Sequence, residues 1–251
     1  MALISRPPEP FLGGRLQLRQ PERGHRAGTD AVLLAACAPD RPMRAVDVGA
    51  GVGAAGLSAL ARVSGLDMPF IEIDAGLAEL CDCNIAENGM GTQARALRAD
   101  VLTAVTRRAA GLEDGAFDLV LTNPPFLDPK AARVSPDPHK ARAHVAFGGL
   151  DGWMKASLAL LRPSGLFLMI HRADALAEIL AGAQGRIGGL RLMPVHAKAG
   201  EPAVRLLVAG KKGSKAPLSI LPPLVLHEAG GSFTEFTNAI HRGDAAIPLA
   251  I

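Results

Sequence analysis

Short apolar runs alternate with longer helical patterns along most of the chain. A short apolar run bounded by turn signals is typical of a buried strand, whereas a period near 3.6 is typical of a helix. The expected strands are Arg44–Val48, Pro69–Ile73, Ala94–Arg98, Phe117–Thr122, Gly165–His171, Leu190–Pro194 and Val204–Ala209. The expected helices are Ala54–Val63, Ala75–Glu87, Val101–Ala110, Gly152–Leu161 and Ala173–Ala183. Because strands and helices alternate, the pattern predicts an α/β fold with a parallel sheet covered on both faces.

The beginning of the chain departs from this alternation. Residues 13–22 alternate weakly between apolar and polar side chains, which predicts a small hairpin or cap. Thr29 or Asp30 can N-cap a helix that runs towards Ala38 and stops at the prolines beyond it. We therefore expect a small cap segment over about residues 1–38.

The end of the chain departs from it as well. The loop His196–Pro202 has no helical pattern, so the two strands that flank it are expected to form a hairpin. Beyond them, Ser219–Leu226 is again apolar and Phe233–Ile240 has the pattern of a last helix. We find no internal repeat and no convincing linker, so a single domain over residues 1–251 is expected.

The expected strand Phe117–Thr122 ends in Asn123-Pro124-Pro125-Phe126. Two consecutive prolines cannot continue a β-ladder, so the chain leaves the sheet at this point. The residue before a proline is restricted to extended geometry, which fixes the direction of Asn123. The corner can accept two hydrogen bonds from an exocyclic amine and stack an aromatic ring on its base. A simple polar turn is the alternative.

A glycine-rich turn follows the expected strand Arg44–Val48. Glycines at positions 49, 51 and 53 let the backbone approach a ligand closely at a helix N-terminus. Residues 51–56 also match the dinucleotide-binding pattern. Asp47 favours a different ligand, because a carboxylate suits a positively charged cofactor better than a pyrophosphate. Glu72 lies about 20 positions past the glycines, where an acceptor for ribose hydroxyls is expected.

Together, these motifs resemble those of class I S-adenosylmethionine-dependent methyltransferases. Asp-x-Gly-x-Gly-x-Gly at 47–53, Glu-x-Asp at 72–74, Asp100 and the Asn-Pro-Pro-Phe corner look like the amino-methyltransferases that act on adenine, guanine or glutamine nitrogens. Gly-Thr-Asp-Ala-Val-Leu-Leu at 28–34 is similar to a segment of the bacterial tRNA adenine-N6-methyltransferases, which modify the adenine beside the anticodon of a valine tRNA. The match spans about residues 21–243.

The resemblance implies a Rossmann-like, doubly wound, mostly parallel seven-stranded sheet with one antiparallel strand. It also implies S-adenosyl-L-methionine as the cofactor and methyl transfer to an exocyclic nitrogen. The cofactor-binding residues it implies are Thr29, Asp30, Asp47, Gly49, Gly51, Gly53, Glu72, Asp100 and Asn123. Asp47 and the glycines would hold the methionine end, Glu72 the ribose and Asp100 the adenine amine. The individual roles of Thr29 and Asp30 stay open.

The catalytic residues implied are Asn123, Pro124, Pro125 and Phe126. The Asn123 side-chain oxygen and the Pro124 carbonyl would accept hydrogen bonds from the target amine and stabilise the positive charge that develops there. Phe126 would stack on the base. This chemistry requires no metal and no covalent intermediate.

Purely structural roles for these residues, and other enzymatic activities for the chain, remain open. Asp47 and Asp100 can act as local caps, and Glu72 can be a surface residue. The other acceptors to consider are guanine N2 in ribosomal RNA and glutamine N5 in a protein. Relatives of those two kinds often carry a His after the corner or a Tyr at its end, where this chain has Leu127 and Phe126. A nicotinamide-dependent oxidoreductase is the alternative from a different class. The chain also departs from the tRNA enzymes at one position, because Val145 stands where they usually carry an acidic residue.

The distribution of charge says more than the formal net charge of +3. Basic residues crowd positions 15–26 and the stretch 130–144 after the corner. A basic segment beside an amine-binding corner suits RNA phosphates, and a solvated loop is its alternative. The candidate RNA-binding residues are Arg26, Lys130, Arg133, Lys140 and Arg142. With no Tyr and one Trp, the chain lacks an evident stacking platform, which favours one base of an RNA, such as a tRNA, held in one pocket.

Composition adds a few limits. Hydrophobic residues make up 49% of the chain and charged residues 20%, which is ordinary for a globular protein. No apolar run of about 18 residues exists, so no membrane span is expected. Residues 1–14 lack the apolar region of a secretory signal, and we expect a cytoplasmic protein. Cys37, Cys81 and Cys83 lack the spacing of a zinc site, so they are expected to be reduced and structural.

Overall fold

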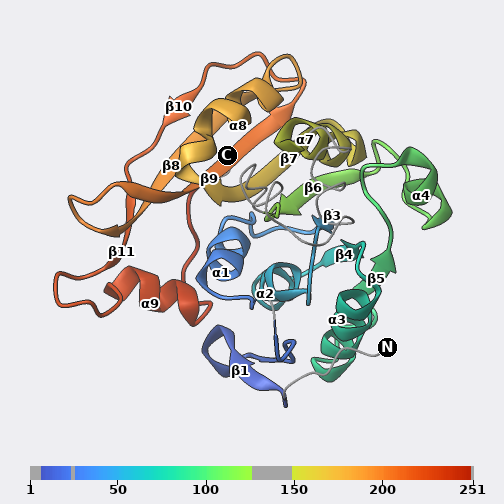
Figure 1. Cartoon of the computed structure of the whole chain (residues 1–251), viewed down its shortest axis with the longest axis horizontal. Coiled ribbons are helices and arrows are strands. Elements are labelled where there is room, and N and C mark those ends of the chain that lie inside the picture. Colours follow the sequence, from blue (N-terminus) through green and yellow to red (C-terminus); the bar gives the residue numbers. More distant parts are fainter. Residues whose placement is uncertain (1–6, 24–25, 126–148, 250–251) are drawn as a thin grey trace, which may run out of the picture.

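The computed structural model of the protein describes residues 7–23, 26–125 and 149–249. Within these ranges the centre is a nine-stranded sheet of order β10-β8-β9-β7-β6-β3-β4-β5, and β11 also pairs with β8 (Figure 1). Its strands are β3 (Met43–Val48), β4 (Leu66–Glu72), β5 (Ala94–Arg98), β6 (Phe117–Thr122), β7 (Leu161–Arg172), β8 (Ile187–Lys198), β9 (Ala203–Lys212), β10 (Ser219–Ile220) and β11 (Leu224–His227).

The inner strands run parallel. β3 pairs in parallel with β4 and β6, and β5 and β7 extend the sheet on either side in the same sense. β9 lies between β7 and β8 and is antiparallel to both. The predicted hairpin, with one antiparallel strand in a mostly parallel sheet, is therefore confirmed. All seven predicted strands form, and β10 and β11 add two short strands that run parallel to β8.

Helices cover both faces of this sheet. They are α1 (Thr29–Ala36), α2 (Ala54–Arg62), α3 (Ala75–Glu87), α4 (Ala104–Ala109), α7 (Gly149–Leu160), α8 (Leu176–Ala183) and α9 (Glu235–His241). One apolar cluster joins α1, α2, α3 and α9 to the first face, and a second joins α7 and α8 to the other. In β6, Leu119 and Leu121 belong to the first cluster and Val120 to the second. This alternation is expected of a strand that is buried on both faces.

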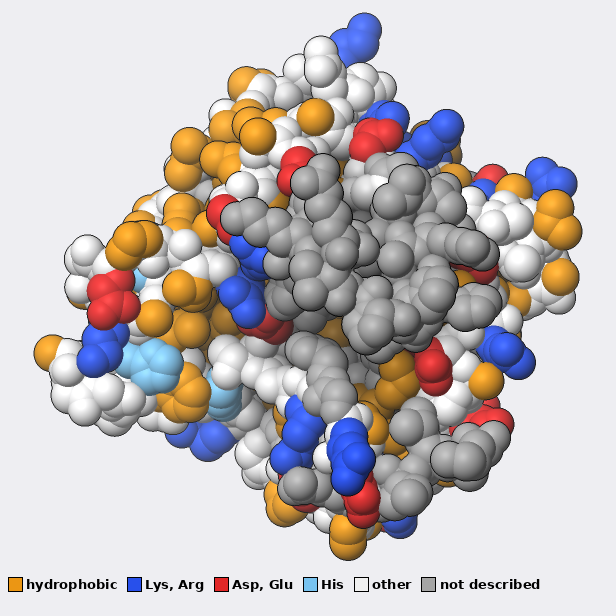
Figure 2. All heavy atoms as spheres, in the orientation of Figure 1, with side chains coloured by type: hydrophobic (Ala, Val, Ile, Leu, Met, Phe, Trp, Pro, Cys, Tyr) orange, Lys and Arg blue, Asp and Glu red, His pale blue; other side chains and the backbone are white. Residues whose placement is uncertain are grey.

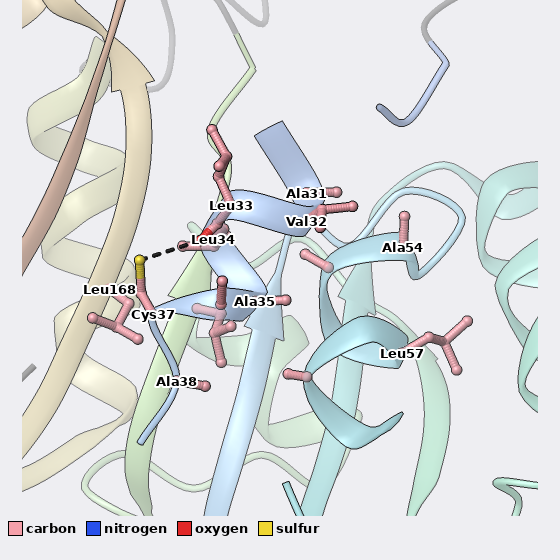
Figure 3. Close-up of a cluster of buried hydrophobic side chains, with 14 of the residues drawn as sticks. Ala31, Val32, Leu33, Leu34, Ala35, Cys37, Ala38, Ala54, Leu57 and Leu168 are labelled. Carbon is pink, nitrogen blue, oxygen red and sulfur yellow. Dashed lines mark hydrogen bonds between the residues drawn. The ribbon is translucent and has the colours of Figure 1, made fainter. Parts of the chain in front are cut away.

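The contact between α1 and α2 fixes the start of α1 relative to the sheet. Figure 3 shows Leu33 of α1, Leu57 of α2 and Leu168 of β7 in one apolar cluster, and all three side chains are fully buried. The Cys37 thiol donates a hydrogen bond to the Leu33 carbonyl at 3.2 Å. Because this cluster holds α1 firmly, residues 28–30 at its N-terminus lie at a defined place beside the carboxyl ends of the strands.

A small hairpin precedes α1, as the sequence predicts. It consists of β1 (Glu9–Phe11) and β2 (Leu16–Leu18), which pair antiparallel. Leu16 and Leu18 are buried in the same cluster as α2 and α3, and the hairpin lies beside these two helices (Figure 1). The hairpin begins at Glu9, earlier than the weak alternation over residues 13–22 indicates.

Several helices begin at other residues than predicted, and the starts of α1 and α4 have a clear physical reason. Gly28 is the N-cap of α1, and neither Thr29 nor Asp30 caps it, because the Asp30 carboxylate turns to an arginine on β9. The predicted helix Val101–Ala110 begins only at Ala104. The residues before it form a turn of their own, which local side-chain hydrogen bonds hold in place of helical ones.

Hydrophobic side chains gather on the surface over β8, β10 and α8 (Figure 2). Ile220 of β10 is 69% exposed, and Leu218 just before it is 42% exposed. In the parts of the chain that the structure describes, no helix has the length and apolar character that crossing a membrane requires.

Candidate cofactor and acceptor site

A cavity of about 670 Å³ lies at the carboxyl ends of β3 and β6. Sites for small ligands measure roughly 300–1,000 Å³, and doubly wound sheets bind ligands at the carboxyl ends of their strands. One group of lining residues, here called the glycine wall, is Asp47, Gly49, Ala50, Gly51, Val52, Asp74 and Leu77. A second group, the arginine wall, is Arg23, Arg26, Thr29, Asp30 and Arg205. Asn123 lines the same cavity.

Asp47 is the buried carboxylate of the glycine wall, with 2% of its surface exposed. Among the described residues, its carboxylate accepts one hydrogen bond, from the Gly56 N–H at 2.9 Å. Burial raises the pKa of Asp47 to about 7, the Gly56 N–H opposes this rise, and the negative charge of Glu72 adds to it. A positively charged ligand group beside this carboxylate would favour its ionised form. The site therefore suits a cofactor that carries positive charge.

The glycine-rich turn after β3 brings the backbone to the cavity. Gly51 lines the cavity with a φ of 57°, and the space where its side chain would begin is open. Gly56 serves packing instead, since a Cβ there would lie 1.7 Å from the ring of Phe70. The first N–H groups of a helix lack partners within the helix, so this close seating of α2 lets the Gly56 N–H reach Asp47.

Glu72 ends β4 and supports the turn rather than lining the cavity. Its two carboxylate oxygens accept from the N–H groups of Gly51 and Asp74, each at 2.9 Å. Asp74 lines the cavity and also caps α3, because its Oδ1 accepts from the Leu77 N–H at 2.9 Å. The role of Glu72 as ribose acceptor stays a prediction, and Asp74 is the neighbouring carboxylate that reaches the cavity.

Two more predicted cofactor residues lie outside the cavity lining. The Asp100 carboxylate accepts from the Leu102 N–H and from the Thr103 hydroxyl, both at 3.0 Å. These bonds form the turn before α4, so a local structural role for Asp100 fits its geometry. Gly53 is the N-cap of α2, where a Cβ would lie 2.8 Å from the Cys81 sulfur.

Side chains from distant parts of the chain form the arginine wall. Arg205 on β9 donates from Nε to the Asp30 carboxylate on α1 at 2.8 Å, across 175 residues of sequence. These side chains are 29% and 24% exposed, respectively. Arg26, predicted to bind RNA, lines the cavity and pairs with Glu9 of β1 at 2.6 Å. The structure thus brings Thr29 and Asp30 to the cavity and adds Arg205, which no local pattern predicts.

The acceptor corner is tied to the glycine-rich turn by Trp153 of α7. The indole Nε1 donates to the Thr122 hydroxyl at 2.9 Å, and that hydroxyl donates to the Val48 carbonyl at 2.9 Å. The indole also rests on Gly49, where a Cβ would lie 2.8 Å from the ring. The residue before Asn123 is thereby fixed relative to β3. Apart from its being the one Trp of the chain, nothing in the sequence singles out Trp153.

Part of the predicted site cannot be placed. Pro124 is buried and Pro125 is exposed at the end of the described range. The predicted site residues that lie outside the described residues are Phe126, Lys130, Arg133, Lys140 and Arg142.

The doubly wound sheet with its antiparallel β9, the glycine-rich turn and the acids at the ends of β3 and β4 define a class I methyltransferase, an enzyme that uses S-adenosyl-L-methionine. A family model of the methyltransferase small domain matches residues 26–141 of the chain. This match gives no support to a nicotinamide cofactor.

Relatives agree on the class and differ in the acceptor. The chain is 27% identical over 237 residues to tRNA1(Val) (adenine(37)-N6)-methyltransferase of Porphyromonas gingivalis, with 91% of each protein covered. It is 36% identical over 164 residues to release factor glutamine methyltransferase of Mycobacterium tuberculosis, covering 58% of this chain and 50% of that protein. It is 33% identical, with a TM-score of 0.74, to the crystal structure of a predicted O-methyltransferase from Agrobacterium tumefaciens, covering 87% of this chain and 98% of that one.

Proposed function

We propose that the protein transfers a methyl group to an exocyclic amino nitrogen of a nucleobase in RNA, with adenine N6 of a tRNA as the target. The observation that carries this proposal is that Asn123 lines the same cavity as Asp47 and the glycine-rich turn. An acceptor group and a cofactor pocket must share one space for methyl transfer to occur in line. The likeness to a tRNA adenine-N6-methyltransferase over 91% of the chain supports the same acceptor.

In this proposal the glycine wall holds the cofactor. Asp47 opposes the positive charge at its methionine end, Gly51 leaves room for it, and Asp74 or Glu72 accepts from the ribose hydroxyls. Thr29, Asp30 and Arg205 complete the cavity from the arginine wall. S-adenosyl-L-methionine supplies an activated methyl group on a sulfonium, and this chain's own part is to bind and orient.

Asn123 and Pro124 prepare the acceptor. An aromatic amine is a weak nucleophile because its lone pair is delocalised into the ring. Two acceptors, the Asn123 side-chain oxygen and the Pro124 carbonyl, would turn the amine towards tetrahedral geometry and stabilise the charge that develops on it. Both acceptors are useful only to a nitrogen with two hydrogens. The corner therefore fits an amine better than a hydroxyl, which has one hydrogen to donate.

A protein glutamine is the second candidate acceptor. Its side-chain amide is also an –NH₂ group, and the 36% identity to a release factor glutamine methyltransferase favours it specifically. That likeness spans half of the relative, whereas the tRNA enzyme is matched along almost its whole length. RNA is therefore the acceptor that we propose, in the cytoplasm. Arg26 and the basic stretch 130–142 would contact its phosphates.

Methyl transfer to fractionated acceptors tests the proposal. The protein is incubated with tritium-labelled S-adenosylmethionine and separate fractions of tRNA, ribosomal RNA and protein. Label is expected in the tRNA fraction. Label in the protein fraction alone would overturn the RNA acceptor in favour of glutamine, and label in ribosomal RNA alone would favour guanine N2.

A thermal-shift assay checks the cofactor separately. A ligand that binds the folded state raises the melting temperature through mass action. S-adenosylhomocysteine is expected to raise it and NADH is not. A rise in melting temperature with NADH alone would contradict S-adenosylmethionine as the cofactor, and with it the proposed methyl transfer.

A further inference from the structure

Two asparagines at the end of helix α3 contact the N-terminal hairpin. Asn84 lies in the last turn of the helix and Asn88, four residues later, is its C-cap, so both lie on the same side. The Asn88 amide accepts from the Gln17 N–H at 2.9 Å and donates to the Gln17 carbonyl at 2.8 Å. The Asn84 amide does the same with Arg19, at 2.7 and 3.0 Å. The two side chains thus pair with the outer edge of the hairpin as a neighbouring strand would.

The second donor of each amide goes to a different place. Asn88 donates to the backbone carbonyl of Asn84 in its own helix, at 2.7 Å. Asn84 donates to the carbonyl of Val52 in the glycine-rich turn, at 2.9 Å. Asn84 is therefore bonded to the hairpin and to the turn at once, whereas Asn88 is bonded to the hairpin and to α3.

The Asn84 amide has no freedom to rotate. Its side chain is fully buried, and the oxygen and both N–H donors are all used. A flipped amide would set the oxygen against two carbonyls and the NH₂ group against the Arg19 N–H, so the bonding pattern fixes its orientation. Leaving such buried groups unpaired would be costly.

Both ends of this connection belong to the cavity. Val52 is part of the glycine wall. On the other side, Pro21 and Arg23, which follow Arg19 closely in the sequence, also line the cavity. One buried amide therefore bridges the glycine-rich turn and the N-terminal segment directly. A shift of either segment would change the width of the cavity.

We propose that Asn84 is a positioning residue for cofactor binding, which holds the glycine-rich turn and the N-terminal segment at the separation that the cofactor needs. The inference rests on the proposed function only in that the cavity binds the cofactor. It does not depend on which acceptor is methylated.

Asn88 offers a matched control. Asn88→Ala removes the same pair of hydrogen bonds to the hairpin without touching the glycine-rich turn. Asn84→Ala is expected to weaken S-adenosylhomocysteine binding by about tenfold or more in calorimetry, because the three hydrogen bonds of this buried amide, which link the two segments, are lost. Asn88→Ala is expected to lower the melting temperature while the Kd stays within about twofold. A similar loss of affinity in both variants, or in neither, would overturn the proposal.

Two further measurements guard against a variant that does not fold. Asn84→Ser keeps a smaller hydrogen-bonding group and is expected to bind S-adenosylhomocysteine with intermediate affinity. Hydrogen exchange in the unaltered protein needs no variant. Saturating S-adenosylhomocysteine should slow exchange of the Arg19 N–H more than that of the Gln17 N–H, since only the former is bonded to Asn84. Equal protection would contradict the proposal. If the unaltered protein binds no S-adenosylhomocysteine, the cofactor site itself is wrong.

Discussion

The glycine wall and the arginine wall line one cavity, but they are built in different ways. The glycine wall comes from short stretches at the ends of β3 and β4, and its carboxylate, Asp47, is 2% exposed. The arginine wall joins α1 to β9 through the Asp30–Arg205 pair, whose side chains are 24% and 29% exposed. Water and salt screen a partly exposed pair far more than a buried charge. Single changes should therefore cost more on the glycine wall.

The largest effect is expected at Asn123, which belongs to neither wall. Removing a preorganised charge-stabilising partner costs on the order of a hundredfold in turnover, so Asn123→Ala should lose about that much. Pro124 and Pro125 keep the turn, and cofactor affinity should change little. Single-turnover methylation with saturating cofactor measures the loss, and Asn123→Asp, which keeps an acceptor, should lose less. A wild-type rate for Asn123→Ala would remove the acceptor role from this residue.

The next largest effect is expected on the glycine wall. Asp47→Ala removes a buried carboxylate that opposes the positive end of the cofactor, and the Kd for S-adenosylhomocysteine should rise by more than about tenfold. The matched control is Asp67→Ala, which removes an exposed carboxylate at the amino end of the neighbouring strand β4, away from the cavity. It should leave the Kd unchanged. Calorimetry on both variants decides. If Asp47→Ala binds within about twofold of the unaltered protein, the glycine wall contributes no more to cofactor affinity than the arginine wall.

The pH dependence of binding sharpens the same comparison. Asp47 takes up its proton at about pH 7 in the cofactor-free protein, and bound positive charge would lower that pKa. Affinity for S-adenosylmethionine should therefore weaken by about tenfold between pH 8 and pH 6. Asp47→Asn cannot titrate and should bind weakly with a flat profile at that residue. An unchanged slope in Asp47→Asn would assign the dependence to another group.

The stability of the cofactor-free protein should decrease as pH rises, whereas its affinity for the cofactor should increase. The pKa of Asp47 is raised from 3.8 to about 7 on folding, so the folded state holds more protons than the unfolded state between these values. The free energy of unfolding of the cofactor-free protein should fall as pH rises through this interval and then level off. Urea unfolding at pH 5 and pH 8 measures this fall, which Asp47→Asn should reduce.

The smallest effect is expected on the arginine wall. Arg205→Ala breaks a partly exposed ion pair, which should cost about 0.5–1 kcal/mol or a few-fold in cofactor affinity. Arg186→Ala, which breaks the exposed pair with Asp151, should lower stability slightly and leave cofactor affinity unchanged. A loss in Arg205→Ala larger than that in Asp47→Ala would reverse the comparison of the two walls.

Most of the fold could be predicted because its elements depend on short-range patterns. α3, β5 and β6 have the predicted bounds, and the others differ at their ends. β10 and β11 could not be predicted as strands of this sheet, because two- and four-residue runs become strands only beside β8. The local sequence does not predict the N-cap at Gly28, because Asp30 pairs with an arginine of β9 that is distant in sequence.

The site residues, too, could be predicted where their partners are close in sequence and could not where their partners are distant. The places of Asp47, Gly49 and Gly51 at the cavity were predictable, since these residues are close in sequence and the glycine spacing has a local geometric reason. Arg205, Trp153 and Asn84 were not, because they reach the site from 175, 31 and 32 residues away from their partners. Asp74 lines the cavity, whereas the carboxylate of Glu72, the residue to which the spacing rule points, bonds two backbone N–H groups. The role of Glu72 towards the ribose stays a prediction.

The chemical identity of the methylated atom tests the central claim most directly. Total tRNA is methylated with isotope-labelled S-adenosylmethionine, digested to nucleosides and analysed by mass spectrometry, with Asn123→Ala in parallel. The account predicts label on the exocyclic nitrogen of adenosine, as N6-methyladenosine, and its loss in the variant. Label on a ribose oxygen, or full N6-methyladenosine formation at the wild-type rate by Asn123→Ala, would contradict it.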